Sequence, residues 1–177
     1  VRMQTDVRLG IYNATKHLLD HGCKHPALAV ADLKNPRFSV REGYRKALGG
    51  SQPYELDLTA VHTVEKIESG FFRNYWERNP FDGLIINVPM ALRNSGNNSR
   101  LNQRLELPDD VKIITVLEYD FNSREKPEIP WIDYSPFDMG REAAARISSV
   151  CLKPEEIFYP GVVKTGDEFK IYTQQEM

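Results

Sequence analysis

Cysteine is scarce in this sequence: the chain has two, Cys23 and Cys151, and they stand in no spacing motif. Regularly spaced cysteines cross-link small secreted domains, so the scarcity excludes a disulfide framework and fits a reducing compartment. Long apolar runs are absent as well. None approaches the ~18 residues that span a bilayer, and the first residues lack the apolar segment of a signal peptide. The sequence therefore predicts a cytoplasmic protein that contacts no membrane.

Dense runs of lysine and arginine are also missing, and the 23 basic and 25 acidic residues give a net charge of -2. Domains that bind DNA through its phosphates usually carry a basic patch and a strongly basic composition. We therefore expect no direct contact between this chain and nucleic acid.

The motifs of the common enzyme classes do not occur either, including G-x-S-x-G, the P-loop, G-x-G-x-x-G and H-E-x-x-H. We predict no enzymatic activity and no cofactor. One cluster has a spacing that suits zinc, because His17 and His21 stand four positions apart and are followed by Cys23 and His25. Histidine is also favoured at the negative end of a helix, and we prefer that interpretation to a metal site.

What the sequence does contain is an alternation of helical and strand-like segments. The periodicity predicts helices over 8–22, from Ser39 to 48, over 66–78, over 90–105 with a break at 94–99, and after Ser135. It predicts strands over 26–30, 58–64, 83–87, 111–117 and 131–133, and a hairpin or two edge strands over 156–161 and 168–173. Alternating units of this kind imply an α/β fold, a parallel sheet flanked by helices on both faces. Such sheets bind ligands beyond the carboxyl ends of their strands.

Several short stretches follow one another along nearly the whole chain in a familiar order. They are A-T-K-H-L-L-D-H-G at 14–22, R-E-G-Y-R-K-A-L at 41–48, E-S-G-F at 68–71, F-D-G-L-I-I at 81–86, L-P-D-D-V-K-I-I at 107–114 and G-R-E-A-A at 140–144. These resemble patterns such as A-x-x-H-L-L-x-x-G-H, R-x-x-G-[FY]-x-x-A-L and V-P-x-D-V-x-V-I of the lactose-repressor (LacI/GalR) family of transcription regulators. No single motif is specific, but their order and spacing are.

The resemblance implies an effector-binding domain similar to periplasmic sugar-binding proteins, in which two α/β subdomains clamp a ligand. We expect residues 7–120 to form the C-terminal subdomain, 133–152 a helix that returns to the N-terminal subdomain, and 153–177 closing strands. The rest of that domain and the DNA-binding head would lie outside this chain. The resemblance further implies a small-molecule effector, a carbohydrate in the first instance, a homodimer, and DNA contact only through the head. Two alternatives stay open: a solute-binding protein of a transport system, and the sensor behind a GntR-type head.

Three predicted effector contacts lie in the first half of the chain. Arg41 matches the family arginine that donates paired hydrogen bonds to a polar effector group. A positive charge in the first turn of a helix is unfavourable to the helix dipole, which argues for a partner. The alternative is a solvated arginine. Asp6 stands near the family's Asp-Asn pair, and the alternative is a helix N-cap. Asn87 follows a strand where the family has Asn-Asp, although Val88 and Pro89 come next here; the alternative is a turn residue.

Four further candidates carry less information. Glu118 stands where the family closes a strand with a ligand-facing aspartate, and the alternative is a solvated loop acid. Trp131 and Phe38 have aromatic faces that suit a sugar ring, although aromatic residues more often belong to the core. Asp133 lies close to the predicted crossover between subdomains. The missing Asn-Asp pair and the displaced aspartate leave the ligand class open.

Overall fold

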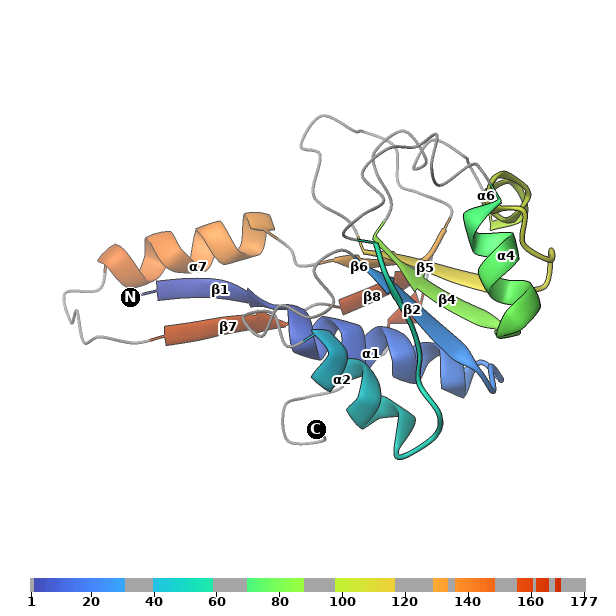
Figure 1. Cartoon of the computed structure of the whole chain (residues 1–177). Coiled ribbons are helices and arrows are strands. Elements are labelled where there is room, and N and C mark those ends of the chain that lie inside the picture. Colours follow the sequence, from blue (N-terminus) through green and yellow to red (C-terminus); the bar gives the residue numbers. More distant parts are fainter. Residues whose placement is uncertain are drawn as a thin grey trace.

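The chain forms a mostly parallel sheet between two layers of helices (Figure 1). A computed structural model describes residues 2–30, 40–58, 70–87, 98–116, 129–133, 136–148, 156–160, 162–165 and 168–169. Five parallel strands pair in the order β3 (Tyr54–Asp57), β2 (Pro26–Val30), β4 (Gly83–Ile86), β5 (Lys112–Val116) and β6 (Trp131–Asp133). Strands β8 (Val162–Thr165) and β9 (Glu168–Phe169) extend the sheet antiparallel. The predicted α/β class with a helix-flanked parallel sheet is confirmed.

The order of the strands places a topological switch between β2 and β4. From β2 the chain moves outward to the edge strand β3 and then returns to β4 on the other side of β2. Ligands of open α/β sheets bind at such a point, beyond the carboxyl ends of the strands. The segments that follow β2 and β4, residues 31–39 and 88–97, lie outside the described residues.

Helices cover both faces of the sheet. Helices α1 (Val7–Asp20) and α2 (Val40–Leu48) pack together on one face, and α4 (Phe71–Arg78) and α6 (Asn98–Leu105) lie over the other. Gly22, Gly49 and Gly50 adopt positive φ values of 88°, 60° and 98°. Glycine tolerates this left-handed conformation, so α1 and α2 end where the sequence predicts. No helix in the described ranges is both long and apolar enough to cross a membrane.

Side chains of the central strands alternate between two buried clusters. On β2, β4 and β5, Leu28, Ile85 and Ile114 face α1 and α2. Their neighbours Ala29, Ile86 and Ile113 face α4 and α6. Every residue of β2 and β4 is buried, which is why both strands are apolar throughout rather than alternating.

The strand predicted over 58–64 lies, except for Leu58, outside the described residues, and the sequence analysis missed the strand that comes just before it. The strand that pairs with β2 is β3, over Tyr54–Asp57, and Leu58 extends it by donating its N–H to the Val30 carbonyl at 3.1 Å. The residues from 59 onward lie outside the described ones. The sequence pattern did not indicate β3 because the strand contains the polar residues Glu55 and Asp57. An edge strand is only partly covered, so its residues need not be apolar.

For the C-terminal part, one of the two predicted arrangements, two edge strands, is confirmed, and the other, a hairpin between 156–161 and 168–173, is wrong. Strand β7 (Glu156–Pro160) pairs in parallel with β1 (Arg2–Asp6) in a separate two-stranded sheet, and β9 pairs with β8 at the edge of the main sheet. The two segments are therefore edge strands of different sheets and do not form a hairpin with each other. Helix α7 (Pro136–Ser148) forms after Ser135, as predicted. In Figure 1, α7 and the β1–β7 pair extend together away from the main sheet.

Candidate functional site

Three predicted contacts lie directly after β4 or on β6, at or near the carboxyl edge of the main sheet. The strand register aligns Ile86 with Thr115 and Thr115 with Trp131. Asn87 and Asp133 therefore reach the same edge of the sheet with β5 between them, and their backbones are about 10 Å apart, which is two strand spacings. The Asn87 N–H donates to the Ala29 carbonyl at 3.1 Å, which fixes its backbone against β2. Trp131 is half-buried at the start of β6. The topology therefore gathers Asn87, Trp131 and Asp133 where an α/β sheet takes a ligand.

Asp6 sits at the junction of the two sheets, as the last residue of β1 and the N-cap of α1. Its Oδ1 accepts the Leu9 N–H at 2.9 Å, and the residue is 5% exposed. The N-cap interpretation is confirmed. A second role in effector binding stays a prediction.

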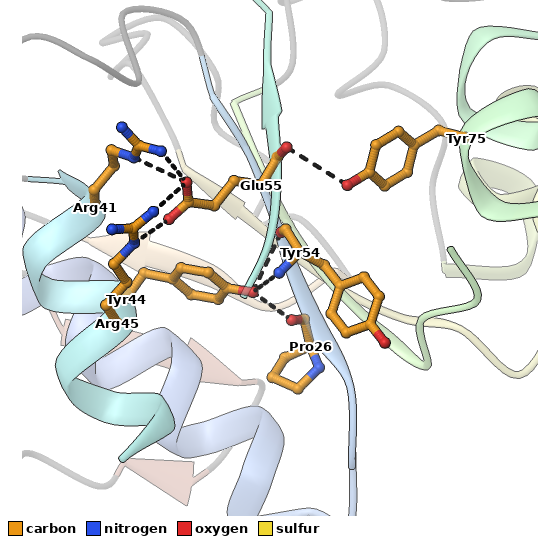
Figure 2. Close-up of polar contacts among 7 residues, drawn as sticks. All are labelled: Pro26, Arg41, Tyr44, Arg45, Tyr54, Glu55 and Tyr75. Atoms are coloured by element: carbon orange, nitrogen blue, oxygen red, sulfur yellow. Dashed lines mark hydrogen bonds and ion pairs between the residues drawn. The ribbon is translucent and has the colours of Figure 1, made fainter. Parts of the chain in front are cut away.

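Arg41, in the first turn of α2, forms an ion pair with Glu55 of β3 (Figure 2). Arg41 donates from Nε at 2.8 Å and from Nη2 at 2.5 Å to the same oxygen, Oε2. Arg45, one turn along, donates from Nε to Oε1 at 2.7 Å and from Nη2 to Oε2 at 3.1 Å. The Glu55 side chain is 9% exposed, against 39% for Arg41 and 52% for Arg45.

The charge of Glu55 is stabilised by its partners. Burial by itself would raise the pKa of this carboxyl group, but the hydrogen bonds and charges of Arg45 and Arg41 lower the pKa below its ordinary value. Glu55 is therefore ionised at neutral pH, and the two guanidinium groups share one carboxylate.

Sequence reasoning missed Glu55 and Arg45. The available signal was the spacing of Arg41 and Arg45, four positions apart on one helix face, where two like charges repel unless an anion lies between them. The sequence also holds a departure from the family pattern at this point. The pattern R-x-x-G-[FY] puts its arginine three positions before the glycine, whereas Arg41 precedes Gly43 by two, and the third position is Val40, which is buried in the core.

Tyr44, next to Arg45 on α2, holds the start of β3. Its buried hydroxyl donates to the Pro26 carbonyl at 2.7 Å and accepts the Tyr54 N–H at 2.9 Å (Figure 2). Burial raises the pKa of this phenol far above its ordinary value. Tyr75 of α4 donates to the backbone carbonyl of Glu55 at 3.5 Å. The edge strand is thus held by tyrosines from both helical layers.

The histidine cluster has the geometry of a helix end. The His17 and His21 rings lie 4.0 Å apart with their planes tilted by 30°, and His21 Nδ1 is 2.7 Å from the His17 carbonyl oxygen. Within the described ranges, no three histidine, cysteine or acidic side chains come together in a group that could hold a metal ion. The remaining candidates, Phe38 and Glu118, lie outside the described residues.

Neither a protein-family model nor a curated protein matches the chain. Solved structures do match. A LacI family regulator from Silicibacter pomeroyi superposes with a TM-score of 0.63 and 18% identity over 94% of this chain and 64% of that one. A LacI family regulator from Enterococcus faecium with bound ribose gives 0.61 and 21% over 92% and 62%. A complex of the transcriptional regulator CelR with cellobiose gives 0.55 and 16% over 92% and 52%.

These likenesses confirm the periplasmic-binding-protein-like fold that the sequence predicts. The chain spans about three fifths of the length of the first regulators that it matches. In its fold, the chain is similar to the LacI-family transcriptional regulators.

Proposed function

We propose that this chain is the effector-binding part of a LacI-type transcriptional regulator and that its effector is a carbohydrate. The observation that carries the proposal is the fold: a parallel sheet with a topological switch beside β2, in a chain that superposes on regulators of this family. Two of these matching structures hold ribose and cellobiose, which supports a sugar as the effector class. Because the matching structures named above are regulators, a role in transport is the weaker alternative.

In this proposal the effector binds beyond the carboxyl ends of the strands. Asn87 and Asp133 supply polar groups at that edge, and Trp131 supplies an aromatic face that suits a sugar ring. Arg41 offers terminal N–H groups to paired hydroxyls or to a carboxylate. Asp6, Phe38 and Glu118 complete the proposed set.

The proposed signalling step follows from the arrangement of the elements. In this proposal, residues 7–120 belong to one subdomain, and α7 returns the chain to a second one, to which the β1–β7 pair also belongs. An effector that binds better to the closed arrangement of the two subdomains shifts the population towards it. In a homodimer, this shift changes the spacing of two DNA-binding heads. The chain itself performs no catalysis.

A thermal-shift screen of the full-length protein tests the proposal, with a panel of sugars, sugar phosphates and nucleosides that includes ribose and cellobiose. A compound at about 100 times its Kd adds roughly 2.7 kcal/mol of stability. We expect a sugar to stabilise the wild-type protein, and the Arg41→Ala and Asn87→Ala variants to lose part of that effect. A panel in which no sugar stabilises the wild type would contradict the proposal.

A further inference from the structure

Glu55 uses only part of the hydrogen-bonding capacity of the Arg41 guanidinium. Both hydrogen bonds from Arg41 end on Glu55 Oε2, and they use two of the five N–H donors of a guanidinium. Figure 2 shows the other terminal nitrogen of Arg41 on the side away from the carboxylate. No other residue in the described part of the chain is hydrogen-bonded to Arg41.

The Glu55 backbone is fixed by strand pairing and by a hydrogen bond from a tyrosine. Glu55 lies in β3, opposite Leu28 of β2, and its backbone carbonyl accepts the Tyr75 hydroxyl. Arg45 donates to Oε1, which Arg41 does not contact, and also to Oε2. A long arginine side chain that is 39% exposed would otherwise sample many rotamers.

We propose that Glu55 is a positioning residue for the effector: it holds Arg41 by Nε and Nη2 so that the remaining N–H groups face the paired oxygens of a sugar or a sugar acid. Arg45 supports this arrangement by occupying the second carboxylate oxygen, which lowers the repulsion between the two cations. This inference rests on the proposed function, because it names how one residue of the proposed site is oriented.

The contrasting interpretation is a clamp that fastens α2 to the edge strand and has no part in ligand binding. The two interpretations differ in what they predict. A clamp contributes to the stability of the fold alone, whereas a positioning residue also changes effector affinity, and changes it only while Arg41 is present.

A double-mutant cycle on effector affinity separates them. Titration calorimetry on the full-length protein, with the sugar that the screen identifies or with ribose and cellobiose as first probes, compares the wild type with Glu55→Gln, Arg41→Ala and the double variant. We expect Glu55→Gln to weaken binding by between about two- and thirtyfold. In the Arg41→Ala background, the same change should have no further effect.

Glu77→Gln is the matched control. Glu77 pairs with Arg73 at 3.0 Å on the exposed face of α4, so the same chemical change there removes an ion pair away from Arg41 and should leave affinity unaltered. If Glu55→Gln does not fold, Glu55→Asp keeps the charge while shortening the side chain and displacing Arg41.

The outcomes are distinguishable. If Glu55→Gln lowers the melting temperature but not the affinity, or weakens binding equally in the Arg41→Ala background, the positioning role is wrong and the proposed function stands. If no compound of the panel binds the wild-type protein, the proposed function fails and the positioning role fails with it.

Discussion

Gly43 of α2 lies against the backbone of Arg8 in α1 so closely that a Cβ atom on Gly43 would stand 2.1 Å from the Arg8 carbonyl oxygen. The glycine of the sequence R-E-G-Y therefore has a packing role: it lets two helices approach on one face of the sheet. The same helix pair is joined by an ion pair between Arg8 and Glu42 at 3.0 Å.

Substituting Gly43 by alanine should separate α1 from α2. Because the obstructing atom is backbone rather than a flexible side chain, the free energy of unfolding should fall by about 3 kcal/mol. Urea unfolding of the full-length protein measures this. Gly140→Ala in α7 is the control: nothing lies within 4 Å of its added Cβ, and alanine favours helix there by up to about 1 kcal/mol. Equal stability of the two variants would contradict the close approach of α1 and α2.

The carboxylate of Asp82 holds the turn that leads into β2. Its two oxygens accept the N–H groups of Lys24 at 2.6 Å and His25 at 2.8 Å. Asp82→Ala leaves both donors without this acceptor and should lower the free energy of unfolding by about 1–2 kcal/mol. Asp110→Ala, in an exposed turn, should change it little. The prediction fails if chemical denaturation gives the same midpoint for Asp82→Ala as for the wild type.

Asp6 offers a way to separate capping from ligand binding. Asp6→Ala removes the acceptor of the Leu9 N–H and should reduce stability by about 1 kcal/mol. Asp6→Ser keeps a capping oxygen but loses the carboxylate, so stability should be largely retained. If Asp6 also contacts the effector, calorimetry on Asp6→Ser should show weaker binding. If Asp6→Ser binds the effector with wild-type affinity, Asp6 acts as a helix N-cap and does not contact the effector.

Cys23 should make stability depend on pH in the alkaline range. Burial, with the nearby Asp82 charge, raises the pKa of this thiol from its ordinary value of 9.0 to about 11 in the folded protein. Between these values the unfolded chain loses the proton first, so the folded state is disfavoured as the pH rises from 9 to 11. Thermal unfolding at stepped pH should show this decline, and Cys23→Ala should reduce it. An unchanged slope in the variant would exclude Cys23 as its source.

Several elements of this fold could be predicted from local sequence because their physics is local. The continuous apolar runs of β2 and β4 mark strands buried on both faces, and positive-φ glycines mark the ends of α1 and α2. The N-cap role of Asp6 could also be predicted, because the Leu9 N–H that Asp6 accepts lies only three residues further along the chain. The edge strand β3 was harder to place, because a strand that is only partly covered keeps polar residues such as Glu55 and Asp57.

The sequence by itself determined the fold class, the helices and the edge of the sheet at which Asn87 and Asp133 are found, since alternating hydrophobic patterns and short turns suffice for these. Only the tertiary structure decided that Arg41 and Arg45 share Glu55 and that Gly43 must lack a side chain. Both depend on how α2 packs back across β2 and α1 after a crossover, and on the register of β3 against β2. Contacts that depend on strand register and on how closely two helices pack leave no pattern in the local sequence. The packing of the whole domain determines which residues make them.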